Sequence, residues 1–216
     1  MQNRWNLTVI LLLCAVSGVV DVVGYIGLSH VFTANMTGNI VLLGIGIGDG
    51  RQAVLSNAAF SLAGFVIGIA AAVFVQRKTG KLVSILYGEF VLFLLVAITV
   101  VLLPVNGGLS SAILVVLSSA MGLQTVAGRN LNIAGLSSTV LTSTLAAFVE
   151  GVMKTKENNI RGLSVDTYLR GSAILLYLGG AAIGSISERF VGLLTVWIAV
   201  GLLVLVLLFQ KKAIHA

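Results

Sequence analysis

The chain has 216 residues, of which 58% are hydrophobic and only 9% are charged. A soluble globule of this size needs far more polar surface than this, so the composition excludes a soluble domain and predicts an integral membrane protein. The formal net charge of +6 does not call for a nucleic-acid partner. The basic residues lie in short loops beside apolar runs, where they orient a membrane protein and contact the lipid bilayer.

Six apolar windows are long enough to cross a hydrocarbon core of about 30 Å as helices. The longest polar interval between them, from Lys154 to Asp166, is a short loop. We therefore expect one transmembrane domain over residues 1–216. The windows fall at residues 7–28, 53–75, 82–103, 109–127, 168–187 and 190–209.

Two further stretches, residues 31–48 and roughly residues 133–153, are too polar or too short for this count. Each could be an extra crossing or a re-entrant half-helix, which enters and leaves the membrane at the same face. Cytoplasmic loops of membrane proteins are enriched in lysine and arginine. Six crossings with cytoplasmic termini leave only Arg51 and Arg189 outside, whereas two extra crossings move the basic cluster at residues 77–81 outside. The sequence therefore favours an all-α protein with six transmembrane helices and two re-entrant half-helices.

The two halves of the chain, residues 1–106 and residues 107–216, have similar patterns. A shift of 105 positions places Thr37-Gly38-Asn39 on Thr142-Ser143-Thr144, and a longer loop then changes the offset to about 112. Each half reads as span, polar half-helix, span, span. Because three crossings reverse the direction of the chain, the second half is predicted to be inverted relative to the first. Inverted-topology repeats with discontinuous helices recur in secondary transporters.

The first polar stretch contains the leading candidate for a functional site. Clustered amides and irregular backbone persist at membrane depth only inside protein or beside a water-filled cavity. On a helix, Asn35 and Asn39 lie one turn apart, Thr37 lies on an adjacent stripe, and Gly38 permits close approach of a ligand or another backbone. The first turn of such a half-helix also suits an anionic group. Alternatively, these polar groups only join helices to one another.

Two carboxylates within predicted spans are candidates for coupling solute movement to an ion. Asp21 lies in the first span and could carry a proton or bind a cation, because ionisable groups at membrane depth are costly and usually functional. Its alternative role is to cap or hydrate a break in the helix. Glu89 lies in the third span, where it could act in a relay. Alternatively, it snorkels or pairs with Lys81 or Lys78.

Gln124, Arg129, Thr142 and Ser143 form the candidate second half of the site. Arg129 could neutralise an anionic solute, or it could pair with Asp21 if both chain breaks fold to the membrane midplane. Otherwise Arg129 is an ordinary cytoplasmic anchor residue.

Several short motifs carry a family resemblance. They are Gly18-x-x-Asp21, Phe32-x-Ala34-Asn35-Met36-Thr37-Gly38-Asn39, Ala120-Met121-Gly122-Leu123-Gln124 and Leu141-Thr142. Through them the chain resembles, over nearly its whole length, the YoaK family of integral membrane proteins, known as domain of unknown function 1275. The resemblance implies a multi-pass protein of the bacterial inner (plasma) membrane, and it supplies no substrate or catalytic residue. Thr125 and Ser143 stand where asparagine and glycine are expected.

The sequence offers little support for an enzyme. It has no histidine pair at metal-ligand spacing, no Walker-type phosphate loop, and no Ser/His/Asp set at one depth. We expect no catalytic residue, no metal and no cofactor. The predicted function is a secondary transporter or facilitator of a small polar or anionic solute. The alternatives are a substrate-binding membrane component energised by separate ATPase subunits and a non-transporting scaffold. Glycine-rich helix faces also allow a homodimer.

Overall fold

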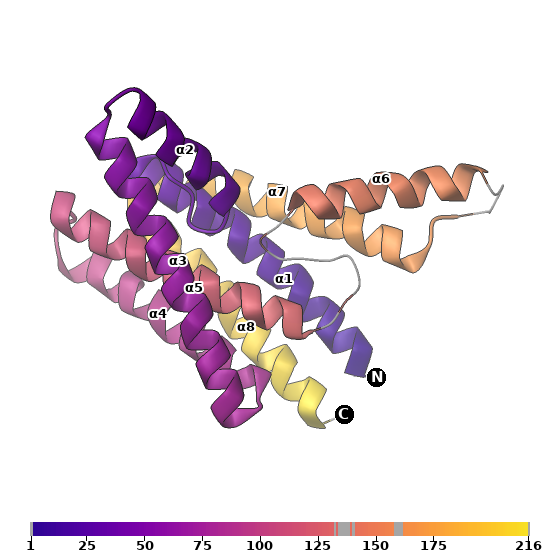
Figure 1. Ribbon diagram of the computed structural model, residues 1–216. Coiled ribbons are helices and arrows are strands. Elements are labelled where there is room, and N and C mark those ends of the chain that lie inside the picture. Colours follow the sequence, from indigo (N-terminus) through magenta and orange to yellow (C-terminus); the bar gives the residue numbers. More distant parts are fainter. Residues whose placement is uncertain (1, 132, 134–138, 140, 158–161, 216) are drawn as a thin grey trace.

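The computed structural model describes residues 2–131, 133, 139, 141–157 and 162–215, and all regular structure in these ranges is helical (Figure 1). The helix α1 continues directly into a π-helical segment, η1, and a short 3₁₀ helix, η2, separates the last two α-helices. The elements are α1 (Gln2–Val22), η1 (Val23–Ser29), α2 (Met36–Gly48), α3 (Gln52–Thr79), α4 (Leu82–Leu102), α5 (Gly107–Asn130), α6 (Leu141–Glu157), α7 (Val165–Val191), η2 (Gly192–Thr195) and α8 (Val196–His215).

In the described part of the chain, five stretches are long and apolar enough to cross a membrane. The last of them spans 48 residues and contains both α7 and α8. The prediction of an all-helical, multi-pass membrane protein is therefore confirmed. The five stretches are Arg4–Ser29, Gln52–Thr79, Leu82–Leu102, Gly107–Asn130 and Val165–Lys212.

Glycines at two crossings show the relative directions of the long helices. A Cβ atom added to Gly180 of α7 would collide with Ala15 of α1, and one added to Gly184 would contact Val19. Both sequences advance together along the contact, so α1 and α7 run in the same direction. By the same criterion α3 and α5 are parallel, because the glycines of α3 at positions 64 and 68 meet Val115 and Ser119.

Helix α8 runs back along α1. The ring of Trp5 stacks on Phe209 with centroids 5.7 Å apart, whereas Leu193 lies beside Gly27 at the other end of the α1–η1 helix. Since α7 is parallel to α1 and α8 is antiparallel to it, the chain reverses between them at Gly192, which has a φ of 57°. Both termini lie at one end of the bundle, which we call the termini end (Figure 1).

The contacts between helices are repeated across the two halves of the chain. Helix α1 packs on α7 and α8, and correspondingly α5 packs on α3 and α4. The short helices α2 and α6 pack on α3 and α7, and α4 meets α8. Exchanging the first four α-helices with the last four maps this set of contacts onto itself, which is the pattern that a two-fold arrangement produces.

The short helix α2 begins beside the interior of α1. The chain reverses at His30, which has a left-handed φ of 54°, and the segment that follows returns as far as Asp21, which binds Thr33. Helix α2 then runs antiparallel to α3, since Gly46 abuts Leu55 and Asn39 bonds to Ser61. The chain thus enters the bundle and leaves it at the end opposite the termini.

Most basic side chains gather at the termini end. Helix α5 is antiparallel to α1, because Gln124 bonds to Leu13 while Asn106 shares a hollow with Gly27 at the far end. The ends of α3 and α5 and the start of α7 therefore lie with the termini. The described basic residues at this end are Arg4, Arg77, Lys78, Lys81, Arg129, Lys154, Arg170, Lys211 and Lys212, and those opposite are Arg51 and Arg189.

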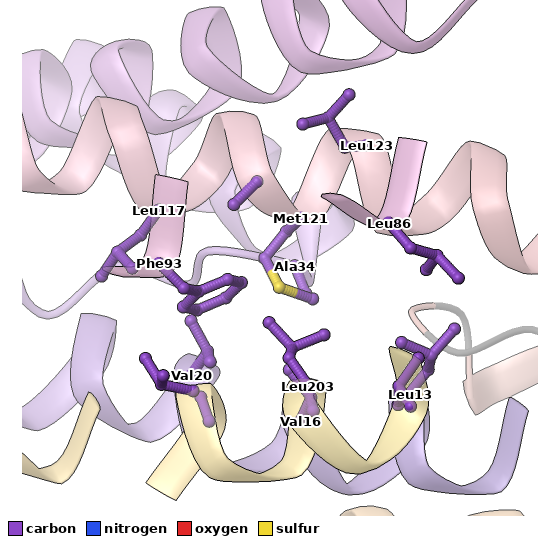
Figure 2. Packing of buried hydrophobic residues seen from close by; sticks show 14 of the residues in the cluster. Leu13, Val16, Val20, Ala34, Leu86, Phe93, Leu117, Met121, Leu123 and Leu203 are labelled. Atoms are coloured by element: carbon purple, nitrogen blue, oxygen red, sulfur yellow. The ribbon is translucent and has the colours of Figure 1, made fainter. Parts of the chain in front are cut away.

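The main hydrophobic core lies between α1, α4, α5 and α8. Figure 2 shows Phe93 of α4 between Val20 and Leu117, with Met121 and Leu203 beside them, and all five side chains are buried. By contrast, many large apolar side chains on α3, α4 and α7 are exposed. In a bilayer such side chains face lipid, since lipid tails are as apolar as the side chains themselves.

The crossing of α1 and α7 yields a first prediction. In Gly180→Val the added side chain collides with the backbone of Ala15, and such overpacking costs about 1–3 kcal/mol or more. We expect a clearly lower unfolding temperature in detergent, as measured by tryptophan fluorescence. The matched control is Gly179→Val, because a Cβ at the neighbouring glycine meets no atom within 4 Å. Equal effects of the two substitutions would contradict the close crossing.

Candidate functional site

The carboxylate of Asp21 binds the segment that precedes α2. Its Oδ1 accepts hydrogen bonds from the backbone N–H groups of Thr33 (2.8 Å) and Ala34 (2.7 Å) and from the Thr33 hydroxyl (3.2 Å). Its Oδ2 accepts from the Tyr177 hydroxyl at 2.6 Å. Asp21 is only 4% exposed. These contacts fit the alternative in which Asp21 stabilises a break in the chain, and they also tie α1 to α7.

Asn39 forms hydrogen bonds with the backbone of a second part of the same segment. Its amide nitrogen donates to the carbonyl of Phe32 (2.6 Å) and to Ser61 of α3 (2.9 Å), and its Oδ1 accepts from the N–H of Phe32 (2.9 Å). Ser61 in turn shares a hydrogen bond of 2.8 Å with Ser118 of α5. Gly38 lies against the Phe32 ring, which a Cβ would approach to 2.9 Å. Asn39 therefore joins α2 to α3, and Gly38 packs against the segment that precedes α2.

A cavity of about 290 Å³ lies where the two short helices begin. Asn35 and Thr37 line it from the start of α2, and Leu141 and Thr142 line it from the start of α6. Side chains of α3, α5 and α7 complete the wall. The N-termini of α2 and α6 thus meet at one hollow, even though the two helices are separated by more than ninety residues.

The lining of this cavity combines polar and apolar groups and has a positive bias. Arg129 is the charged side chain in the described lining, and hydroxyls and an amide accompany it. Helix N-termini add partial positive charge. In the described chain the one ion pair joins Arg51 and Asp49 (3.3 Å), so Arg129 has no described acidic partner. Residues 132–140 contain no acidic side chain. The lining residues with hydrogen-bonding side chains are Asn35, Thr37, Thr125, Arg129, Thr139, Thr142 and Tyr177.

Besides Asp21, Asn39 and Glu89, three further predicted site residues lie outside the cavity lining. Gln124 is fully buried and donates to the Leu13 carbonyl (3.0 Å) and the Ser17 hydroxyl (2.7 Å), so it joins α5 to α1. Ser143 is exposed beside Thr142 and does not line the cavity. Gly38 lies one position beyond the lining residue Thr37.

Glu89 is fully buried on the inner face of α4. Neither of its carboxylate oxygens has a hydrogen-bond partner among the described residues. The alternative in which Glu89 snorkels or pairs with Lys81 or Lys78 is wrong, because its side chain is turned into the core and forms no described ion pair. A buried carboxyl without a partner is costly and calls for an explanation beyond packing.

Asp21 and Arg129 do not form an ion pair in the described structure. Both chain breaks reach the same cavity, as that hypothesis requires, since Ala34 and Thr139 line it together. However, Asp21 is buried behind Tyr177, and Arg129 is exposed. The two charged side chains therefore lie in different environments, one buried and one exposed.

Sequence reasoning missed Phe65, Thr125, Thr139 and Tyr177. The repeat predicted from the sequence aligns them in pairs, because Tyr177 stands 112 positions after Phe65, the offset already visible in the sequence. Likewise, Thr125 and Thr139 share a hydrogen bond of 3.1 Å and correspond, within one position of the 105 offset, to Asp21 and Thr33. A lone tyrosine or threonine in an apolar span gave no signal without that alignment.

The fold and the cavity together define a multi-pass α-helical membrane protein with a partly polar hollow between its helices. A family described as "Protein of unknown function (DUF1275)" matches residues 9–209, and the chain belongs to it. The chain is 36% identical over 219 residues to the UPF0700 transmembrane protein YoaK of Bacillus subtilis (strain 168), covering 94% of this chain and 93% of that relative. The resemblance found in the sequence is thereby confirmed. No solved structure matches.

The contacts of Asp21 give a second prediction. In Asp21→Leu the buried N–H groups of Thr33 and Ala34 lose their acceptor, at about 1–3 kcal/mol for each unsatisfied group. Asp21→Asn keeps one acceptor oxygen, and the Tyr177 hydroxyl can accept from its amide. We therefore expect thermal unfolding to fall strongly for Asp21→Leu and only mildly for Asp21→Asn. Asp49→Asn, at an exposed carboxylate, is the control. A large and equal loss in both Asp21 variants would argue against these contacts.

Proposed function

We propose that the protein is a secondary transporter or facilitator of a small anionic solute, which binds in the cavity between α2 and α6. One observation carries this proposal: the N-termini of two short helices and the guanidinium of Arg129 converge on one polar hollow. Helix N-termini bind anions through unpaired N–H groups and the helix dipole. No acidic side chain lines the described cavity, which favours an anion over a neutral or cationic solute. A volume of about 290 Å³ suits a small molecule.

The membrane arrangement that accompanies this proposal has six crossings and two re-entrant half-helices. It is supported by the return of the chain from His30 to Asp21, which starts α2 beside the interior of α1. It is supported as well by the opposite directions of α7 and α8 within the last apolar stretch. Helix α2 has 13 residues, about 20 Å of helix, which is too short to cross a core of about 30 Å.

We further propose that residues 1–106 and 107–216 form an inverted repeat. In a repeat of equal orientation, α1 and α5 would run in the same direction. Instead they are antiparallel, while α1 is parallel to α7 and α3 is parallel to α5. Three crossings in each half produce this combination. Transporters with inverted repeats expose a central site to either side by rocking one half against the other.

The chain carries no ATPase motif, so any active transport is coupled to an ion or powered by a separate subunit. Asp21 and Glu89 remain the candidate coupling carboxylates. Asp21 has both oxygens engaged by described donors, whereas Glu89 has neither. The buried Glu89 is therefore the better candidate for a group that exchanges a proton during the cycle. This non-enzymatic function needs no cofactor or metal.

The proposed location is a bacterial plasma membrane with both termini in the cytoplasm, because the basic residues gather at the termini end. A third prediction follows. In a Cys14→Ser background, Arg51→Cys and Lys154→Cys should react with a membrane-impermeant maleimide from opposite sides of the membrane, with Lys154→Cys facing the cytoplasm. Labelling of both positions from one side would overturn the six-crossing arrangement.

The solute site is tested by thermal shift. A ligand that binds the folded protein raises its unfolding temperature by mass action. We expect some small organic anions, screened on the purified protein, to stabilise it. Arg129→Gln and Asn35→Ala should each weaken that effect, with at least a tenfold loss of affinity for Arg129→Gln, which is about 1.4 kcal/mol.

The matched control is Arg77→Gln, an exposed arginine at the same end of the bundle. If hits act equally on Arg129→Gln and the parent, the site assignment fails. If no solute stabilises the protein and none crosses proteoliposomes, the scaffold alternative is favoured. Co-purification of an ATPase would favour the energised component instead, and a doubled mass in detergent would reveal the homodimer.

A further inference from the structure

We propose that Tyr177 is the gate of the solute cavity on the side away from the termini, and that Asp21 holds this gate closed. This inference rests on the proposed function, since it concerns access to the same cavity. It assigns Asp21 a positioning role, exerted through the tyrosine.

Tyr177 lines two hollows. One is the solute cavity, and the other is a second hollow of about 360 Å³ between α1 and α7. In the described structure Tyr177 is the single residue that lines both. The second hollow extends past Asp21 to Tyr25 and Ile26, which are exposed in the part of the α1–η1 helix far from the termini. Displacing this one ring would therefore connect the two hollows.

Tyr177 is fixed at two points, its hydroxyl and its backbone. Its hydroxyl donates to Asp21 at 2.6 Å, and Asp21 is itself fixed by Thr33 and Ala34. The backbone of Tyr177 packs directly against Gly18 of α1, where no other side chain fits. The closed position therefore depends on one side-chain hydrogen bond on a fixed backbone. Such a bond can break without unfolding either helix.

The corresponding place in the other half has no such bond. Phe65 stands 112 positions before Tyr177 and has no hydroxyl. Thr125, the counterpart of Asp21, directs its hydroxyl to Met121 and Thr139. On that side the lining includes the exposed Arg129 at the termini end. The two halves thus differ at this position, where a tyrosine bonded to Asp21 lines the cavity in the second half and a phenylalanine lines it in the first.

The gate can be tested by cysteine accessibility without knowing the solute. In the Cys14→Ser background, Thr37→Cys places a thiol in the first turn of α2, at an exposed position in the cavity lining. The probe is a sulfonated, membrane-impermeant maleimide applied to right-side-out and inverted vesicles. With Tyr177 present, we expect modification from the termini side only. In Tyr177→Phe the rate from the opposite side should rise about tenfold, and in Tyr177→Ala still more.

Two controls separate the gate from general damage. Tyr168→Phe removes the hydroxyl of an exposed tyrosine on the same helix and should leave both rates unchanged. Thermal unfolding of each variant reports whether it is folded, and Tyr177→Phe preserves the ring and the contacts between Asp21 and Thr33.

The outcomes distinguish the gate from the proposed function. Unchanged labelling from the opposite side in both Tyr177→Phe and Tyr177→Ala would overturn the gate, as would labelling from both sides with Tyr177 intact. A thiol at position 37 that reacts from neither side would mean that the cavity is closed to water, and the proposed function itself would fail.

Discussion

The arrangement depends on hydrogen bonds to the backbone of residues 32–34, because a bilayer core offers no water to an unpaired N–H or C=O group. Asp21 accepts hydrogen bonds from the N–H groups of Thr33 and Ala34. Asn39 forms hydrogen bonds with both the N–H and the C=O group of Phe32. Two side chains thus replace the pairing that a continuous helix would supply. This replacement lets the chain turn back within the bundle, so that α2 begins at the cavity. Without it, α2 would not begin at the cavity.

The two halves achieve similar geometry by different chemistry. On one side a carboxylate joins Asp21 to Thr33, whereas on the other two hydroxyls join Thr125 to Thr139. The glycine contacts are shared, but the charged groups are not. Asp21 is buried in the first half, and Arg129 is exposed in the second. The two halves are therefore unequal in charge, even though their helix contacts correspond.

The sequence predicted the long helices well, since runs of about twenty apolar residues have few alternatives in a membrane protein. It located the two polar stretches but could not assign their side chains. Asn39 and Gln124 turn toward neighbouring helices, whereas Asn35 caps the start of α2 and, with Thr37, lines the cavity. Both pairs are polar residues within apolar stretches of sequence. Only the packing of the helices decides which of them bond to a neighbouring helix and which line the cavity. For Glu89 the nearby lysines suggested a partner, but its position on α4 turns it into the apolar core.

The glycine crossings also bear on how the bundle moves. Where α1 meets α7, and α3 meets α5, main chain lies against main chain. Helices that interlock through large side chains must disengage ridges from grooves before they tilt. Smooth backbone surfaces have no such ridges, so they resist separation yet allow one rod to swivel on the other. The same small residues that hold the helices together would therefore permit the rocking that the proposed transport cycle requires.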